Sequence, residues 1–405
     1  MSRARPTLAR RAFLGAAASA GLFAALSRHT ARAAEERYLV VYWMKGGWDP
    51  AFVFDPHFES DVIHRDPSST EASLGGLSFA DAATRPSVRA FFNTWGAKTA
   101  FVNGIAVGSI SHDGCTRLML TSSRGTTSPD FATRIAHGTS LPHVVISGPR
   151  FPGDLGEVVL AVNSTLIGTA DGTLPTPRND DSEARIQAWL AAEAAELPAS
   201  RRKDQYLDGL GRLPDLHEHA ADFSGAISTN DADIFGTVAD VLAAGLARSV
   251  MLEGSLPMFG NWDSHVSNDS LQDKAYEWGF ARLAELMERL KTTAAPGGGV
   301  LADRTTVLVL SEMGRSPVLN SAQGKDHWPW TSAMLVGASV AGGRVLGGTD
   351  SGFAGENVDP VSGEVSATGE AITPASLAAG LLTAFDIDPT EAYPDVTPFT
   401  APFQG

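Results

Sequence analysis

The stretch Thr305-Thr306-Val307-Leu308-Val309-Leu310-Ser311-Glu312-Met313-Gly314-Arg315 decides the fold class of this chain. Its first six residues are apolar or β-branched, a pattern typical of a strand that is buried on both faces within a parallel sheet. Polar residues begin abruptly at Ser311, where this strand would leave the sheet. Ligands of open α/β sheets bind at the carboxyl ends of the strands. The stretch therefore predicts an α/β fold with a site at this edge, to which Glu312 and the later His327 are expected to belong.

Similar apolar runs and helical patterns lie on both sides of this stretch. The expected strands cover residues 37–44, 99–105, 143–146, 249–252 and 332–336. The expected helices cover residues 87–95, 115–121, 182–197, 231–247, 269–291 and 374–385. Residues 55–90 are otherwise expected to be irregular, with His57 and His64 at the surface, and the glycine pairs within residues 342–350 are expected to form tight turns.

Residues 1–33 have the features of an export signal. Arg10 and Arg11 form a twin-arginine pair before an apolar stretch, and Ala31-Arg32-Ala33 offers small residues to a signal peptidase. The apolar stretch is short for a membrane span, although an uncleaved N-terminal anchor is the alternative. We expect a periplasmic or extracellular protein with no stable membrane span in its mature form. Residues 34–405 are expected to form a single domain with a helical insertion at about 175–230.

Charge and cysteine content narrow the classes of partner. The full chain has a formal net charge of −15, and the part after residue 33 is six units more negative because residues 1–33 contain six arginines and no acid. This charge disfavours nucleic acid and anionic membranes as partners. Cys115 is the single cysteine, which excludes an intrachain disulfide framework. No feature of the sequence indicates a protein partner.

Asp49 lies just past the first expected strand, after a pair of glycines. Gly46 and Gly47 allow the backbone to turn tightly and to approach a ligand closely. A carboxylate in this place can hold a cation. Asp is also common in turns and at helix caps, and for Asp49 taken alone capping is the simpler interpretation.

The second expected strand leads into Ser111-His112-Asp113 and then a helix. Free backbone N–H groups and the positive end of a helix allow such a loop to hold an anion. One of these three residues can act as a nucleophile or a proton carrier. Alternatively, Ser111 or Asp113 merely caps the helix, and the sequence leaves both interpretations open.

Asp263 and His265 form a third polar motif, in Asn261-Trp262-Asp263-Ser264-His265. In an extended chain, side chains two positions apart project from the same face. A carboxylate and an imidazole that converge in this way can hold a divalent cation. The alternative is a hydrogen-bonded Asp–His pair in the loop before the next helix.

Taken in order, these motifs resemble the alkaline phosphatase/arylsulfatase superfamily, and most closely its exported branch catalogued as domain of unknown function 1501. The motifs that carry the resemblance are Lys45-Gly46-Gly47-Trp48-Asp49, Ser111-His112, Leu141-Pro142-His143-Val144-Val145, Asn261-Trp262-Asp263-Ser264-His265, Ser311-Glu312-Met313-Gly314-Arg315-Ser316-Pro317 and Asp326-His327-Trp328. They extend over almost the whole chain after the export signal.

The resemblance implies an alkaline-phosphatase-like, three-layer α/β sandwich with a central, mostly parallel sheet flanked by helices. It also implies metal-dependent hydrolysis of phosphate or sulfate esters. The metal ligands that it implies are Asp49, Asp263, His265, Glu312 and His327. The catalytic residues that it implies are Ser111, His112 and Arg315, of which the arginine would clamp an anionic oxygen.

Two departures from the superfamily shape the expected function. Met313 stands where alkaline phosphatases have a histidine ligand, so we expect one divalent cation, zinc, calcium or magnesium, rather than two. The loop at Ser111 lacks the sulfatase pattern of Cys or Ser, then Pro, then Arg, which argues against a formylglycine at Cys115. The expected protein is an exported hydrolase of a small anionic ester. The alternative is a non-catalytic exported binding or assembly protein with the same fold, and the absence of a nucleotide fingerprint disfavours an oxidoreductase.

Overall fold

The computed structural model describes residues 36–403, except 138, 140, 157–158, 162–191, 193–233, 255 and 257–259. The predicted export signal at residues 1–33 lies outside the described residues, as does most of the predicted helical insertion at about 175–230 with its helix over 182–197. Within the described part of the chain, no helix is both long enough and apolar enough to cross a bilayer.

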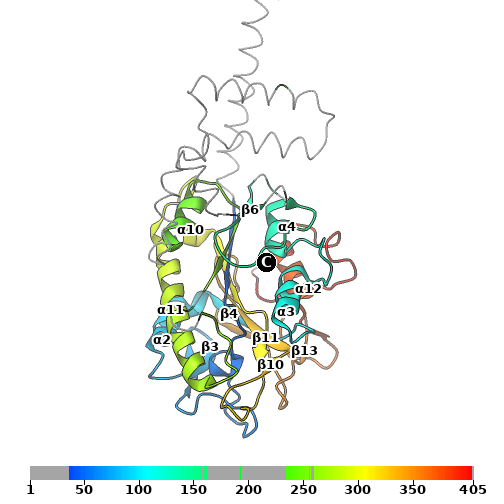
Figure 1. Ribbon diagram of the computed structural model, residues 1–405. Helices are drawn as coiled ribbons and strands as arrows, with labels where there is room; N and C mark the ends of the chain where they lie inside the picture. The colour runs from blue at the N-terminus through cyan, green and yellow to red at the C-terminus, as the bar shows by residue number, and fades with distance from the viewer. Residues whose placement is uncertain are drawn as a thin grey trace, which may run out of the picture.

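An eight-stranded sheet runs through the centre of the molecule in the order β12-β4-β11-β8-β1-β7-β5-β6 (Figure 1). Its strands are β1 (Tyr38–Trp43), β4 (Thr99–Ala106), β5 (His143–Val145), β6 (Val159–Ala161), β7 (Ser249–Glu253), β8 (Thr305–Leu310), β11 (Trp330–Gly337) and β12 (Arg344–Gly347). Neighbouring strands are parallel except where β11 pairs with β4 and β8. The mostly parallel sheet that was predicted is confirmed.

β1 and β8 lie side by side in the middle of the sheet because both of their faces are apolar. Every residue of each strand is buried, and the two strands pair in parallel along their whole length. Alternate side chains of β1 point to opposite faces, with Tyr38, Val40 and Tyr42 in one core and the residues between them in another. The sheet thus separates two hydrophobic cores.

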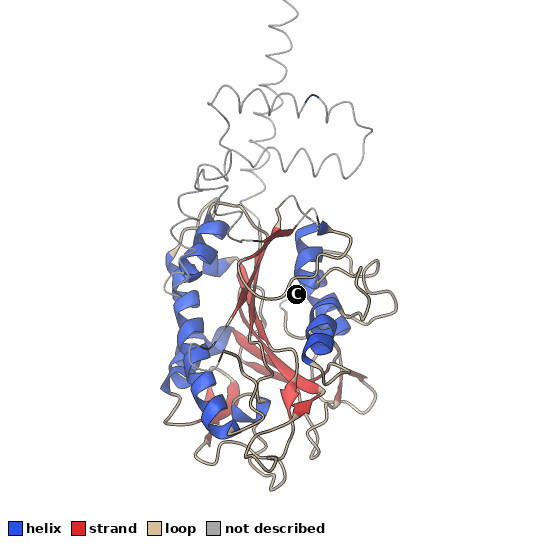
Figure 2. Ribbon diagram, in the orientation of Figure 1, coloured by secondary structure: helices blue, strands red, loops and turns tan. Residues whose placement is uncertain are grey.

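Two layers of helices cover the sheet (Figures 1 and 2). One face is covered by α2 (Pro86–Trp95), α10 (Ile234–Ala243) and α11 (Asn268–Thr292), and the other by α3 (His112–Thr121), α4 (Phe131–His137) and α12 (Pro374–Ala384). The stripe of α11 that contains Leu283, Leu286 and Leu290 packs in the first core, while Leu377 and Leu381 of α12 pack in the second. The three-layer α/β sandwich is therefore confirmed.

Several short elements differ from the prediction. Residues 70–81 form a hairpin of β2 (Thr70–Leu74) and β3 (Leu77–Asp81) where irregular chain was expected. Gly75 and Gly76 both have positive φ and make its tight turn. β12 adds an edge strand where only turns were expected. The remaining short elements are η1 (Pro50–Phe52), η2 (Gly96–Lys98), η5 (Leu301–Asp303), β9 (Gly314–Arg315), β10 (His327–Trp328), β13 (Asn357–Val358) and β14 (Glu370–Ala371).

Candidate metal centre

The carboxyl ends of β1, β4, β7 and β8 lie along one edge of the sheet, because these four strands run in the same direction. The segment after β4 carries His112, and the segment after β7 carries Asp263 and His265. After β8, the antiparallel pair of β9 and β10 brings His327 back to this edge, opposite Arg315. Residues from distant parts of the sequence therefore meet where a site was predicted.

Three histidines and one carboxylate converge here, and we call His112, Asp263, His265 and His327 the His–Asp cluster. Ligand atoms of His112, Asp263 and His327 lie within 4.8 Å of one another. Nε2 of His265 lies 2.9 Å from Nε2 of His327 and 3.4 Å from Oδ1 of Asp263. Nε2 of His112 lies 3.4 Å from Oδ2 of the same carboxylate. All four side chains are partly exposed, so the cluster is open to a ligand.

Hydrogen bonds on the far side of the rings fix the orientation of His112 and His327. Nδ1 of His112 donates to Oε1 of Glu312 at 2.7 Å. Nδ1 of His327 donates to the carbonyl oxygen of Ile110 at 2.6 Å. Acceptors in these positions hold a proton on Nδ1 and turn Nε2 toward the cluster, which is the usual orientation of metal-binding histidines.

The approach of His265 and His327 is what a shared cation would explain. Nδ1 of His265 faces Oδ1 of Asp326 at 3.3 Å, so both rings are held with Nδ1 protonated and Nε2 as an acceptor. A proton or a cation shared by the two Nε2 atoms accounts for their separation of 2.9 Å. Imidazole nitrogens with one carboxylate are a ligand set that zinc and related divalent cations accept. The residues of the cluster therefore fit a divalent cation.

The charges around the cluster also favour a cation. Hydrogen bonds to Asp263 and Glu312 raise the pKa of His112 to about 9. Partial burial acts to raise the pKa of Asp263, but the hydrogen bond from His112 and the charge of Arg315 hold that pKa well below its usual range. Desolvation lowers the pKa of His327 and so favours its neutral, ligating form. The carboxylates that stabilise a proton on His112 would equally stabilise a bound metal ion.

Glu312 is fully buried behind His112 and is not among the converging ligand atoms. Its two oxygens accept the N–H of Gly46 at 2.9 and 3.1 Å, and one also accepts the hydroxyl of Ser311 at 3.1 Å. Glu312, predicted as a metal ligand, thus orients His112 in the structure. His112, predicted to be catalytic, lies among the converging ligand atoms.

Asp49 also lies outside the His–Asp cluster. Its side chain caps η1 by accepting the N–H of Ala51 at 3.2 Å, as the capping interpretation expected. Its Oδ2 forms a fully buried ion pair with Nζ of Lys325 at 2.7 Å. Asp49, predicted as a metal ligand, thus receives its counter-charge from a lysine that is remote in sequence.

Arg315 is fully buried, and its donors are bound by the protein itself. Its Nη2 donates to Oδ1 of Asp263 at 2.7 Å and to the carbonyl oxygen of Gly46, and Nε donates to the carbonyl oxygen of Gly47 at 2.8 Å. Nη1 donates to the carbonyl oxygen of Lys325 at 3.2 Å. Arg315, predicted as a free clamp for an anionic oxygen, thus holds Asp263 and the turn after β1 in the structure.

The glycine pair after β1 is required by close packing against the loop that carries Asp263. Gly46 and Gly47 have φ of +117° and +81°, a region that side chains disfavour. A Cβ on Gly46 would lie 2.6 Å from the backbone nitrogens of Trp262 and Asp263. The pair thus allows the segments after β1 and β7 to touch beside the cluster.

Ser111 is the N-cap of α3, which begins at His112 and so starts three residues earlier than predicted. Its hydroxyl accepts the N–H of Gly114 at 3.3 Å, as the capping interpretation expected. Ser111 is nonetheless exposed, and it follows Ile110, whose carbonyl oxygen holds His327. The hydroxyl is therefore beside the cluster and accessible from solvent, while Asp113 lies exposed in the first turn.

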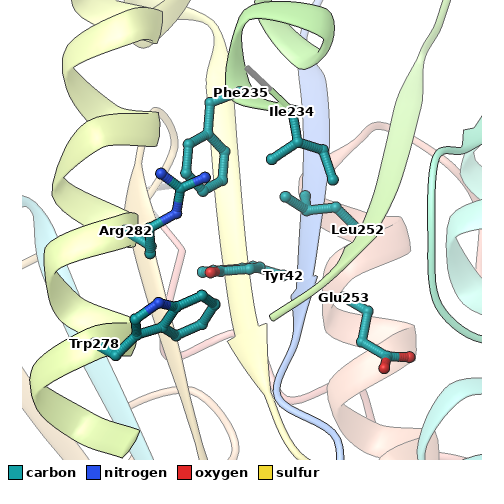
Figure 3. A pocket seen from close by; sticks show the side chains of 7 residues that line it. All are labelled: Tyr42, Ile234, Phe235, Leu252, Glu253, Trp278 and Arg282. Atoms are coloured by element: carbon teal, nitrogen blue, oxygen red, sulfur yellow. The ribbon is translucent and has the colours of Figure 1, made fainter. Parts of the chain in front are cut away.

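A separate pocket lies between the sheet and the layer of α10 and α11 (Figure 3). Tyr42, Phe235, Trp278 and Arg282 are among its lining residues, and the guanidinium of Arg282 stands 4.4 Å from the ring centre of Phe235. None of the cluster residues lines this pocket. Five of its seven lining residues are apolar or aromatic, and it lacks the converging ligand atoms that distinguish the cluster.

Two solved structures are similar to this chain. One is BT4656 in complex with its substrate D-glucosamine-2-N,6-O-disulfate, with a TM-score of 0.34 and 8% identity over 91% of this chain and 82% of that chain. The other is the phosphonate monoester hydrolase of Agrobacterium radiobacter, with a TM-score of 0.30 and 10% identity over 87% of this chain and 74% of that chain. No curated protein matches the sequence.

A family model matches the C-terminal part of the chain. The matched residues are 247–397, which include Asp263, His265 and His327 of the cluster as well as Glu312 and Arg315. The segment that carries most of the candidate centre is therefore similar to the family described as "Protein of unknown function (DUF1501)".

Proposed function

We propose that this chain is an exported, metal-dependent hydrolase of phosphate or sulfate esters. The observation that carries the proposal is the convergence of three imidazole rings and the carboxylate of Asp263 at the carboxyl edge of the sheet. The order of motifs from Asp49 to His327, which resembles the alkaline phosphatase/arylsulfatase superfamily, supports ester hydrolysis as the reaction. A divalent cation held by the His–Asp cluster would polarise the ester oxygen and lower the pKa of an attacking hydroxyl or water.

The protein's own groups prepare this chemistry. Glu312 fixes the tautomer and orientation of His112, and Arg315 holds Asp263 against the turn after β1. The N-terminus of α3 adjoins the cluster and contributes a positive helix end that attracts an anionic group. The exposed hydroxyl of Ser111 at this end of the helix is the candidate nucleophile. We therefore propose a small anionic ester as the substrate class.

Metal analysis of the purified full chain tests the proposal. We expect about one equivalent of divalent metal per chain, loss of ester hydrolysis after chelation, and recovery when zinc, calcium or magnesium is added back singly. The assay uses a panel of phosphate monoesters, phosphate diesters and sulfate esters. Metal-free protein without hydrolytic activity would contradict the proposal. Protein that binds metal tightly but turns over none of these esters would favour the non-catalytic binding module.

The Ser111→Ala variant tests whether Ser111 acts as the nucleophile or only as the helix cap. If Ser111 is the nucleophile, hydrolysis falls by orders of magnitude while the metal content stays unchanged. Loss of the cap alone costs about 0.5–2 kcal/mol of stability. Thr373→Ala is the matched control, because Thr373 caps α12 through a hydrogen bond to Ser376 that lies outside the cluster. Retained hydrolysis in Ser111→Ala would assign the attack to water instead.

We also propose that the protein is exported to the periplasm or beyond. Arg10, Arg11 and the small residues before residue 34 support this destination. The strongly acidic chain supports a small-molecule substrate rather than nucleic acid. Fractionation of cells that express the full chain tests the location, and recovery only from the cytoplasm would contradict it.

A further inference from the structure

We propose that Lys325 is a positioning residue for the candidate metal centre, and that its buried ammonium sets the spacing of the two segments that carry Asp263, His265 and His327. The inference rests on the proposed function, because it concerns how the same centre is held. It starts from Lys325 itself, which is fully buried although it is a lysine. Lysine is almost never buried in this way unless it is paired.

Four buried residues form a closed ring of hydrogen bonds, which we call the Lys325 ring. Nζ of Lys325 binds Oδ2 of Asp49 at 2.7 Å, and Nδ2 of Asn268 donates to the same oxygen at 3.0 Å. The hydroxyl of Ser264 donates to Oδ1 of Asn268 at 2.6 Å. The backbone N–H of Lys325 donates to the carbonyl oxygen of Ser264 at 2.9 Å and closes the ring. All four residues are completely buried.

The ring joins the two segments that supply the ligands. Ser264 lies between Asp263 and His265, and Lys325 lies two residues before His327. The backbone bond from Lys325 to Ser264 links these segments directly, beside the 2.9 Å contact of the two Nε2 atoms. The ammonium of Lys325 links them a second time, through Asp49 and Asn268 to the side chain of Ser264. Because the bonds are buried, water does not compete for them. The ring therefore fixes the spacing on which metal affinity depends.

The ring also accounts for the charge of Asp49. A buried carboxylate needs a counter-charge or it is strongly destabilising. Lys325 supplies that charge at 2.7 Å, and its ammonium makes a second bond to the carbonyl oxygen of His64 at 2.7 Å. The lysine therefore balances the charge of Asp49 without a metal ion. This arrangement suits a centre that binds one divalent cation.

The test measures metal affinity in Lys325→Met, which keeps the length of the side chain and removes its charge. We expect the affinity of the chelator-stripped full chain for Zn²⁺ to fall about 10–100-fold, as it does when outer partners of metal ligands are removed. Competition with a chromophoric chelator measures this affinity. The visible spectrum of the Co²⁺ form should change as well, because the ligand geometry relaxes. If Lys325 only stabilises the fold, Lys325→Met should lower the stability and leave both the Zn²⁺ affinity and the Co²⁺ spectrum unchanged.

Ser264→Ala is the second variant, because it breaks the ring at a neutral bond and leaves no buried charge unpaired. We expect it to weaken Zn²⁺ binding in the same direction, and it decides the question if Lys325→Met does not fold. Glu36→Gln is the matched control. Glu36 forms an ion pair with Arg248 at 2.6 Å, and both side chains are buried. The two residues directly precede β1 and β7, so this pair lies at the edge of the sheet opposite the cluster. The Glu36→Gln variant should be less stable than the wild type and should keep the wild-type affinity for Zn²⁺.

The outcomes separate the two proposals. Folded Lys325→Met or Ser264→Ala with wild-type Zn²⁺ affinity and an unchanged Co²⁺ spectrum would overturn the positioning role while the metal centre stands. Wild-type protein that binds neither ion would overturn the metal centre and this inference with it. A Glu36→Gln control that also loses affinity would trace the effect to general destabilisation and would likewise overturn the inference.

Discussion

His327→Ala is expected to abolish stoichiometric metal binding while leaving the fold intact. His327, like Asp263, approaches every other member of the cluster. Its Nε2 lies 2.9 Å from Nε2 of His265 and 3.9 Å from Oδ1 of Asp263, and its ring centre lies 4.4 Å from that of His112. Loss of an inner ligand should weaken binding by more than the roughly 10–100-fold that outer partners contribute. Elemental analysis after dialysis against metal-free buffer measures the content, and circular dichroism checks the fold.

His57→Asn is the matched control for this loss. The imidazole of His57 is also partly buried, but it pairs with Asp55 and Glu59 rather than with the cluster. Its φ of 46° is a value that Asn tolerates well. The control should keep its metal. Full metal content in His327→Ala, or an equal loss of metal in both variants, would show that the cluster is not the metal-binding site.

Arg315→Met is expected to cost about 3–5 kcal/mol of stability, because each buried acceptor left without its donor costs roughly 1–3 kcal/mol. The substitution leaves the carbonyl oxygens of Gly46, Gly47 and Lys325 without their donor and Asp263 without its partner. Arg315→Lys should be intermediate, because one ammonium cannot reach acceptors spread around a planar guanidinium. Denaturant unfolding, compared at its midpoint, measures both variants.

Arg89→Met provides the comparison for an exposed arginine. Its ion pair with Asp81 is 2.6 Å long, but half of the arginine side chain is exposed, so its loss should cost at most about 1 kcal/mol. If Arg315→Met unfolds at the wild-type midpoint and loses only ester hydrolysis, then Arg315 binds the substrate as the sequence suggested. Loss of stability with the charge removed supports the structural role instead.

The central strands and the layered fold could be predicted from sequence because burial on both faces leaves an unbroken apolar run. Residues 305–310 and 38–43 show this directly. The hairpin of β2 and β3 escaped prediction because β2 is largely exposed and therefore carries no apolar period. The edge strand β12 was hidden in the same way, since its glycines and a short apolar pair suggested only turns.

The meeting of the candidate site residues at one edge could be predicted from sequence, but the partner of each side chain could not. Polar residues after strands predict which edge is functional, and Asp263, His265 and His327 do meet there. Whether a carboxylate reaches a cation or lies behind a histidine depends on a partner elsewhere in the chain. For Glu312 that partner is His112, and for Asp49 it is Lys325. Local patterns contain no information about such partners.

The strand order of the sheet has a consequence for the time course of maturation. β1 pairs with β7 and β8, which come from much later in the sequence, and pairings between remote segments slow folding. The ligand-bearing segments after β4 and β7 and the hairpin after β8 come together only when these strands have joined. An ion would therefore bind late, to the folded chain alone, and each tenfold rise in its free concentration above the Kd would add about 1.4 kcal/mol to the unfolding free energy. Metal binding would therefore stabilise the completed fold and would not direct its formation.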